Sequence, residues 1–500
     1  MASPFDTSGI TTGSDGIRRY DGLPRNLVQM LRRSTELVPT REAVVELGGA
    51  RLSYRQLLDA SARVAGGLRA AGSAPGSRAA IRLSNGADWV LAFFGCQLAG
   101  VVAVPVNTRL TDDEVRYVVE DSGAGFTFEP GASLPDGDPV VDDSAGPDDV
   151  AAIFYTSGTT GFPKGAMTTH HNFLSNAESA RRVIGMTQGE PTRTLVSVPL
   201  FHVTGCNSQL LALTHLGGTT VVMPQFEVQA FLQAIAAERI DNLVSVPAIF
   251  WLAINQPNFA EHDVSVVRFL SYGGAPIAPE LVRSIMAAFP AARVGNGFGL
   301  TETSSLATYL PHAWAAQNAD SVGFAVPVDD LRLRDPDSRS GVGELLVRGP
   351  NVVKGYWNKA QATAETFVDG WLHTGDLALI DDEGLVRIVD RAKDMINRGG
   401  ENVYCVEVEN VLAGAPGVFE AAVVAVPDPM MGEKVGAVLV PVPGRQIDVD
   451  AVVSYTAEHL AEFKVPQYVA VRSEPLPRNP GGKVLKPVLR EKTVWGEPLR

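Results

Sequence analysis

A strand-to-loop stretch at residues 150–165 constrains the fold of this chain more than any other segment. Val150 to Phe154 is an apolar run that predicts a buried strand, and a loop of glycine and hydroxylated residues follows it, ending in Pro163-Lys164-Gly165. The segment after Lys164 reads as extended. The common nucleotide loop instead has Lys-Ser/Thr opening a helix, so this stretch predicts a phosphate site of a different kind.

The composition of this loop suits an anion. Gly158 and Gly161 allow the backbone to approach closely with its N–H groups exposed. Further donors are the hydroxyls of Thr156, Ser157, Thr159 and Thr160 and the ammonium of Lys164. A polar surface hairpin is the alternative interpretation of the same residues.

Helices and strands alternate on both sides of the loop. Ser53-Tyr-Arg-Gln56 and Thr111-Asp-Asp-Glu114 fit capping boxes, which predict helix starts. The expected helices span about 54–71, 87–99, 112–121, 204–216, 227–238 and 279–289. The expected strands span about 78–83, 101–104, 194–198, 219–223, 242–246 and 267–272. This alternation predicts parallel sheets covered by helices, an α/β fold.

The pattern changes toward the C-terminus. Short β segments and turns dominate about 341–389, and a compact α/β segment follows Arg391. The sequence therefore predicts a flexible lead-in (1–25), a large domain of helix-covered sheets (26–390) with a small β subdomain (about 330–390), and a small mobile α+β domain (391–500).

Composition excludes several classes of protein. The net charge of −14 and the absence of a basic cluster argue against nucleic-acid binding. The uncharged run Trp89 to Val106 approaches membrane-spanning length, but Gly100 and Pro105 divide it into an expected buried helix and strand. The three cysteines lack metal-ligand spacing and indicate buried thiols in a reducing compartment. We therefore expect a cytoplasmic protein, with a homodimer as one candidate assembly.

The loop YTSGTTGFPKG resembles the signature loop of the adenylate-forming superfamily, which comprises acyl-CoA synthetases, adenylation domains of peptide synthetases and firefly-type luciferases. Further motifs follow in the family order, so the resemblance extends from about residue 40 to 492. It implies ATP, Mg²⁺, coenzyme A and a small carboxylic acid as the partners of the chain. It also implies that Lys393 is the hinge between the large and small domains.

The resemblance assigns roles to residues at three strand ends. The segment Pro199 to Gly205 would border the acid, with Trp251 as a further pocket candidate, and Ser271 to Pro276 would pack against adenine. Thr301 would bind the α-phosphate and Glu302 would hold Mg²⁺. The implied acyl pocket comprises His202, Val203, Thr204, Gly205 and Asn296. The implied nucleotide residues include Gly273, Gly274, Ala275, Asn296, Gly297, Phe298 and Gly299, with Phe298 standing where the family usually has tyrosine.

Two later motifs complete the implied site. Asp376 would accept the ribose hydroxyls and Arg391 would contact ribose or phosphate. Lys483, in Arg478-Asn-Pro-Gly-Gly-Lys483, would be the catalytic lysine of adenylation, and Lys486 is a nearby decoy. The implied coenzyme A tunnel comprises Arg398, Gly399, Gly400 and Glu401.

These assignments predict a carboxylate:CoA ligase for a fatty or aromatic acid, which resembles bacterial fatty-acid and aryl-acid CoA ligases. Two alternatives stay open at this point. The chain could release the adenylate or load a carrier protein, or it could be a noncatalytic nucleotide-binding protein on the same fold. The intact Lys164, Glu302, Asp376 and Lys483 argue against the last.

Overall fold

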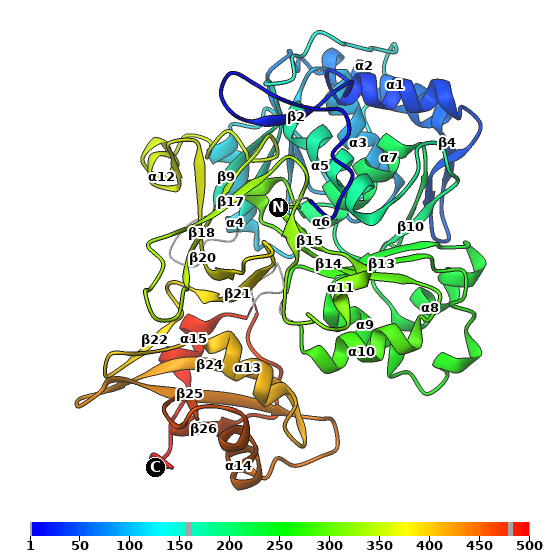
Figure 1. The fold of residues 1–500 in the computed structure, drawn as a ribbon. Coiled ribbons are helices and arrows are strands. Elements are labelled where there is room, and N and C mark those ends of the chain that lie inside the picture. Colours follow the sequence, from blue (N-terminus) through cyan, green and yellow to red (C-terminus); the bar gives the residue numbers. More distant parts are fainter. Residues whose placement is uncertain (1–2, 157–162, 276, 479–483, 500) are drawn as a thin grey trace.

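A computed structural model describes residues 3–156, 163–275, 277–478 and 484–499. It shows a mixed α/β protein in which a large N-terminal part is followed by a smaller C-terminal part with its own sheet (Figure 1). The predicted fold class is confirmed.

The largest sheet has nine strands in the order β16-β15-β14-β13-β12-β10-β11-β3-β4. Its strands are β3 (Glu42–Glu46), β4 (Arg51–Ser53), β10 (Arg193–Val196), β11 (Thr219–Val222), β12 (Asn242–Ser245), β13 (Phe269–Gly273), β14 (Arg293–Phe298), β15 (Thr308–Leu310) and β16 (Phe324–Ala325). The pairs from β3 through β14 are parallel, while β4, β15 and β16 add antiparallel edges. The carboxyl ends of the parallel strands therefore meet at one edge, where ligands bind in such sheets.

A second sheet of five strands, in the order β7-β5-β6-β8-β9, carries the glycine loop. Its strands are β5 (Arg78–Ile81), β6 (Val102–Pro105), β7 (Phe126–Phe128), β8 (Val150–Thr156) and β9 (Lys164–Thr169). The first four are parallel, and β9 runs antiparallel to β8. The extended segment predicted after Lys164 is confirmed by β9.

Helices cover both sheets. They are α1 (Leu27–Leu37), α2 (Tyr54–Ala70), α3 (Ala87–Leu98), α4 (Asp112–Ser122), α5 (His170–Ile184), α6 (Val203–Gly205), the π-helix η1 (Cys206–Leu211), α7 (Ala212–Leu216), α8 (Val228–Ala237), α9 (Pro247–Ile254), η2 (Phe259–Glu261), α10 (Pro279–Ala288), η3 (Thr301–Thr303) and α11 (His312–Ala315). Both predicted capping boxes, at Ser53 and Thr111, are present. The helix expected at 204–216 forms, but its middle is a π-helix. Such segments often lie at functional sites.

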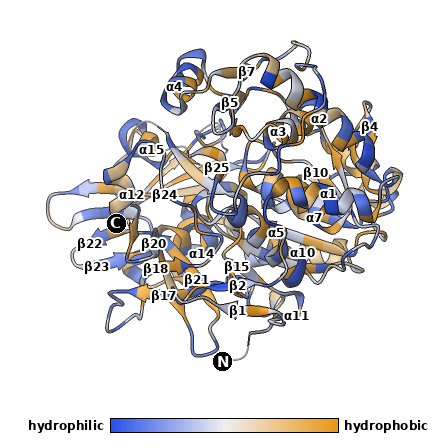
Figure 2. Cartoon of the chain, turned by 90° about the horizontal axis from the view of Figure 1, so that it is seen from above, coloured by the Kyte–Doolittle hydropathy of each residue, from blue (hydrophilic) through white to orange (hydrophobic). Residues whose placement is uncertain are grey.

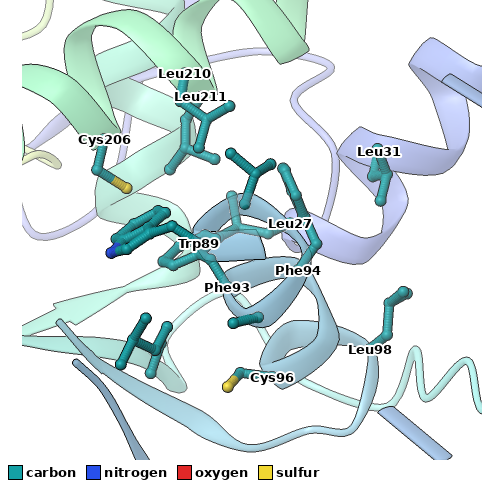
Figure 3. Packing of buried hydrophobic residues seen from close by; sticks show 14 of the residues in the cluster. Leu27, Leu31, Trp89, Phe93, Phe94, Cys96, Leu98, Cys206, Leu210 and Leu211 are labelled. Atoms are coloured by element: carbon teal, nitrogen blue, oxygen red, sulfur yellow. The ribbon is translucent and has the colours of Figure 1, made fainter. Parts of the chain in front are cut away.

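The largest core cluster joins helices of both sheets. Trp89 and Phe93 on α3 stack with ring centroids 5.4 Å apart, and Phe93 meets Phe173 of α5 edge-on. Figure 3 shows Trp89 and Phe93 together with Leu27 and Leu31 of α1 and Leu210 and Leu211 of η1. In Figure 2, apolar and hydrophilic residues lie side by side along α1, which presents only one face to this core.

The apolar run at 89–106 divides as predicted into α3 and β6, both buried. Across the part of the chain that the structure describes, no helix combines the length and the apolar character needed to cross a bilayer.

Within the predicted lead-in, two short strands pair and one side chain is buried against the large part. Strands β1 (Ile10–Thr12) and β2 (Arg18–Tyr20) pair antiparallel, and Tyr20 is only 4% exposed. The Tyr20 hydroxyl is 2.9 Å from the Ser179 hydroxyl, and the Arg182 guanidinium lies 4.4 Å from its ring centroid. Long-range anchoring of this kind leaves no signal in a segment rich in glycine and serine.

A third sheet forms the small β region. It contains β17 (Asp330–Arg334), β18 (Gly343–Arg348), β19 (Phe367–Val368), β20 (Trp371–Ile380) and β21 (Val386–Arg391), with α12 (Ala360–Thr366) between β18 and β19. The C-terminal sheet contains β22 (Ile396–Arg398), β23 (Glu401–Val403), β24 (Val418–Asp428), β25 (Gly432–Pro441) and β26 (Tyr468–Val471). Its helices are α13 (Cys405–Ala413), α14 (Val449–His459), η4 (Glu462–Lys464) and α15 (Lys486–Lys492).

Candidate active site

A small cavity of about 70 Å³ lies at the carboxyl ends of β12, β13 and β14. Its wall combines residues predicted for two different ligands, the acid (Val203, Thr204) and the nucleotide (Gly273, Gly274, Gly297, Gly299). The rest of the wall consists of Ala180, Ile184, Ser208, Val244, Ser245, Ser271, Tyr272, Ser305, Leu306 and Tyr309. One hollow therefore adjoins both predicted sites.

Two glycines of this wall are required by the backbone, Gly273 by close packing and Gly274 by its conformation. A Cβ on Gly273 would lie 2.1 Å from the carbonyl oxygen of Gly297, its partner on β14. Gly274 has φ of +75°, a conformation that side chains other than glycine rarely adopt. The exposed Ala275 follows, so this strand end offers bare backbone, as a flat ligand such as adenine needs.

The remaining acyl-pocket predictions fall beside this cavity. His202 is the N-cap residue of α6, and its ring lies 4.7 Å from that of Phe201. Gly205 packs where a Cβ would lie 2.4 Å from the Pro199 carbonyl oxygen. The Asn296 amide donates to the carbonyl of Ser321 at 3.0 Å. Among the described residues, these three do not line the cavity, and their role toward the acid stays a prediction.

Tyr356 links the predicted phosphate residue Lys164 with the predicted magnesium ligand Glu302, which is far from it in the sequence. Its hydroxyl donates to Glu302 Oε1 at 2.7 Å, and Lys164 Nζ lies 5.0 Å from the centroid of its ring. The segment around Tyr356 is held along β9, because Trp357 N donates to the Gly165 carbonyl and Met167 N to the Gly355 carbonyl. Burial and the Glu302 charge raise the pKa of Tyr356, so it remains a hydrogen-bond donor.

Sequence reasoning missed Tyr356. The only local signal was an aromatic pair, Tyr356-Trp357, which is equally typical of a core. Glu302 and Thr301 lie in η3, directly after β14, and both are half-buried. Phe298, at the end of β14, packs against the apolar cluster beneath the third sheet.

Asp376 and Arg391 pair with each other. They are opposite on β20 and β21, and Arg391 Nε lies 2.6 Å from Asp376 Oδ1. Asp376 is 3% exposed whereas the Arg391 side chain is 38% exposed, so the arginine reaches outward from a buried carboxylate. The two predicted nucleotide residues thus form one charged unit at the end of the third sheet.

Glu302 could hold Mg²⁺ as an ion that also binds the nucleotide phosphates. No group of three or more His, Cys, Asp or Glu side chains gathers as a metal cage within the described ranges. Mg²⁺ is commonly bound through one or two carboxylates and substrate phosphates, and the half-buried, tyrosine-bonded Glu302 offers such a carboxylate.

The predicted phosphate residues Ser157, Gly158, Thr159, Thr160 and Gly161, and the predicted catalytic Lys483, lie outside the described residues. The flanking residues are described. Thr156 pairs with Lys164 across β8 and β9, and Arg478 forms an isolated bridge with Val484.

Lys486 is a structural lysine. It lies 2.8 Å from Glu409 in a buried ion pair within the C-terminal part. Burial acts to lower the pKa of Lys486, but the Glu409 carboxylate and other acidic neighbours outweigh it and raise the pKa overall. Because Lys486 is engaged in this way, it is a poor candidate for the lysine that acts on a substrate.

The link to the C-terminal sheet runs through exposed Lys393, between β21 and β22. Asp390, just before it, accepts from Cys405 N, and burial raises the pKa of Asp390. Gly399 and Gly400 form the two-residue turn of the β22–β23 hairpin with φ of +60° and +94°. These glycines are therefore explained by the turn, which presents Arg398 and Glu401 at its base.

One aromatic contact spans the large and C-terminal parts. The rings of Trp251 on α9 and Phe419 on β24 lie 4.8 Å apart. Glu420, next to Phe419, pairs with Arg478 at 2.6 Å. The segment that leads to Lys483 is thereby linked through β24 to α9.

Family comparisons match most of the chain. The model of the AMP-binding enzyme family matches residues 31–139 and 127–357, and the model of the AMP-binding enzyme C-terminal domain matches residues 407–483. A feruloyl-CoA synthase of Amycolatopsis sp is 38% identical, with 95% of this chain and 99% of that protein covered. The long-chain-fatty-acid–CoA ligase FadD13 of Mycobacterium tuberculosis is 36% identical, with 93% and 98% covered.

A solved structure agrees with these sequence matches. The o-succinylbenzoate CoA synthetase MenE of Bacillus subtilis, in complex with its acyl-adenylate intermediate, superposes with a TM-score of 0.84 at 31% identity, covering 95% of this chain and 99% of that chain. The same synthetase has also been solved with ATP and a magnesium ion.

Proposed function

Because the chain belongs to the AMP-binding enzyme family, we propose that it is an ATP-dependent, AMP-forming ligase that joins a fatty or aromatic carboxylic acid to coenzyme A. The observation that carries this proposal is the cavity at the carboxyl ends of β12 to β14, which adjoins the predicted acid and nucleotide residues at once. An acid and ATP that react directly must meet at such a place.

The reaction has two steps. A carboxylate oxygen attacks the α-phosphorus of ATP, giving an acyl-adenylate, and pyrophosphate leaves. The thiol of coenzyme A, after losing its proton, then attacks the acyl carbon and displaces AMP. Positioning and charge stabilisation suffice for both steps, so no nucleophile from the protein is needed.

We assign the nucleotide to the wall formed by β13, β14 and β20. Asp376, held by Arg391, would accept the ribose hydroxyls, and the bare backbone at Gly273 and Gly274 would adjoin adenine. Thr301 would bind the α-phosphate. Glu302, oriented by Tyr356, would hold Mg²⁺, which neutralises phosphate charge when bound.

We assign the phosphate cover to residues 156–164 and the catalytic ammonium to Lys483. Lys164 would supply a charge toward the β- and γ-phosphates, because it stands beside the Tyr356–Glu302 pair. Lys483 would stabilise the charge that develops as carboxylate and α-phosphate react. The engagement of Lys486 with Glu409 supports this choice between the two lysines.

We further propose that residues 391–500 move as a unit about Lys393 between the two steps. The ring contact of Trp251 with Phe419 and the bond of Arg478 to Glu420 favour an orientation for adenylation, since they draw the segment before Lys483 toward the large part. Rotation would exchange this face for the Gly399–Gly400 hairpin, beside which the pantetheine arm would pass.

A pyrophosphate-release assay over short, medium, long and aromatic acids tests this proposal. We expect at least one acid to release pyrophosphate with ATP and Mg²⁺, and to give its CoA thioester and AMP by mass spectrometry when coenzyme A is added. Pyrophosphate release without thioester would indicate an enzyme that stops at the adenylate or loads a carrier protein. Nucleotide binding without release for any acid would indicate a noncatalytic protein.

We also propose a cytoplasmic, reducing location, supported by three free cysteines that are all buried. Burial raises the pKa of each of these thiols, and Cys405 donates to the Asp394 carbonyl, as expected of structural cysteines. A homodimer stays a prediction.

A further inference from the structure

We propose that the acid activated by this enzyme is compact and ring-sized, and that it carries a hydroxyl or similar hydrogen-bonding group away from its carboxylate. Long unbranched chains are disfavoured, with Tyr309 as the residue that closes the cavity. This inference rests on the proposed function and names the substrate class of the same site.

The size of the cavity is the first argument. It offers about 70 Å³, whereas pockets that enclose drug-sized ligands have roughly 300–1,000 Å³. The part of its wall formed by Ala180, Ile184, Leu306 and Tyr309 belongs to a buried apolar cluster. A cavity that binds benzene has about 150 Å³, so any acid must displace part of this wall. A long chain must displace more of the buried cluster than a compact ring does.

Tyr309 is fixed at this wall from three sides. Its hydroxyl lies 2.9 Å from the Ser271 hydroxyl, and its ring lies edge-on to that of Phe5, 6.4 Å between centroids. A Cβ on Gly295 would lie 2.3 Å from the Tyr309 oxygen, so the glycine makes room for the phenol. Tyr309 is 5% exposed, and burial raises its pKa to about 12, so it remains protonated. A side chain held in this way is a rigid part of the cavity wall, and we assign to it the limit on acid length.

The polarity of the wall is the second argument. Two hydroxyl pairs line it, Ser271 with Tyr309 and Ser208 with Ser305, the latter 2.7 Å apart. Within each pair one hydroxyl donates to the other, whose own hydrogen stays available, and both oxygens have accepting capacity left. A hydroxylated ring can use these groups, whereas a chain of methylenes cannot.

The backbone conformation of the turn that carries Ser305 supports a role of this hydroxyl in ligand binding. Ser304 and Ser305 have φ of +54° and +112°, which residues other than glycine rarely adopt. A Cβ on Gly299 would lie 1.6 Å from the Ser305 carbonyl oxygen, so the turn also depends on that glycine. Strained backbone of this kind clusters at ligand sites.

The test compares acids in matched pairs. The probes are benzoic and 4-hydroxybenzoic acid, cinnamic and 4-hydroxycinnamic acid, and hexadecanoic acid, each assayed for CoA thioester formation. We expect kcat/KM for at least one hydroxylated acid to exceed that of its unsubstituted partner, and that of hexadecanoic acid, by about 10-fold or more. A preference for hexadecanoic acid, or ratios near one in both pairs, would overturn the inference while leaving the ligase activity established.

Variants locate the effect. Ser208→Ala is expected to reduce the hydroxyl preference to about 3-fold or less, and Tyr309→Ala to raise kcat/KM for hexadecanoic acid relative to the ring acids by about 10-fold. Tyr309→Phe keeps the ring and is expected to exclude hexadecanoic acid as the wild type does. Tyr455→Phe on α14 removes a tyrosine hydroxyl far from the cavity and is the matched control. Unchanged ratios in both Ser208→Ala and Tyr309→Ala would contradict the assignment.

Isothermal calorimetry tests the substrate preference independently of the ligase activity. If no acid is turned over, the proposed function fails, and direct binding of each acid to the wild-type protein still tests the cavity. Tighter binding of hydroxylated ring acids than of their partners would support the inference, and equal binding would overturn it.

Discussion

The nucleotide wall and the C-terminal part that carries Lys483 differ in how firmly they are held. The nucleotide wall is the part formed by β13, β14 and β20, to which we assign ATP. The wall is fixed: Asp376 pairs with Arg391 across two strands, and Glu302 accepts from Tyr356. The C-terminal sheet is joined through the segment at Lys393 and touches α9 through Phe419. We therefore expect changes in the nucleotide wall to impair both half-reactions, and changes in the C-terminal part or its hinge to impair one.

Removal of the Lys483 ammonium, to which we assign the catalytic role, gives the largest expected effect. We expect Lys483→Ala to slow acyl-adenylate formation by about 10²–10³-fold, the loss typical of one stabilising donor, because no other charge would replace it. Thioester formation from supplied acyl-adenylate should stay within a few-fold of wild type. Single-turnover rates of each half-reaction measure this split.

Lys486→Ala is the matched control for that variant. Its loss leaves Glu409 buried without its partner, which should destabilise the protein by about 3 kcal/mol in denaturant titrations. Equal loss in both half-reactions for Lys483→Ala, or a selective adenylation defect for Lys486→Ala, would contradict the assignment of the two lysines.

A change in the fixed wall should affect both steps. Asp376→Asn removes the charge that holds Arg391 and weakens acceptance of the ribose hydroxyls. We expect kcat/KM for ATP, and the rate with supplied acyl-adenylate under subsaturating conditions, each to fall by about 10–100-fold. A defect confined to one half-reaction would break the distinction between wall and moving part.

A stiffer hinge should impair thioester formation and spare adenylation, the opposite of the effect expected for Lys483→Ala. Lys393→Pro fixes one backbone dihedral in the segment between β21 and β22. We expect adenylation to stay near wild type and thioester formation to fall by about 10-fold, because the rotation that we propose precedes the second step. Wild-type rates in both steps would show that the pivot lies elsewhere.

The ring contact across the two parts should have the smallest effect. Trp251→Ala and Phe419→Ala each remove one side of a contact worth about 0.5–1.5 kcal/mol. We expect adenylation to slow by about 2–10-fold in each and no further in the double variant. Additive losses in this double-mutant cycle would show that the two rings act independently.

The features that could be predicted from the sequence are those that depend on residues close together in the chain. The strand and helix alternation, the capping boxes at Ser53 and Thr111 and the extended segment after Lys164 depend on neighbours in the chain, and all are confirmed. The phosphate, ribose and lysine motifs could be identified because each is a short run of unusual composition, although their roles stay proposals.

What sequence could not predict depends on residues that meet only in the fold. Tyr356 reaches Glu302 across 54 positions, and Tyr309 reaches Ser271 across 38. Tyr20 holds the N-terminal segment against the large part through its contact with Ser179, 159 positions away. Single aromatic residues of this kind have no distinguishing local pattern, so their positions had to come from the structure.

The central claim is that the acid is activated by direct attack on the α-phosphorus of ATP. The most direct measurement uses acid labelled with ¹⁸O in both carboxylate oxygens, with ATP, Mg²⁺ and coenzyme A, and mass analysis of the products. We expect one ¹⁸O atom in each AMP and none in pyrophosphate. Label in pyrophosphate or orthophosphate, or AMP without label, would contradict it.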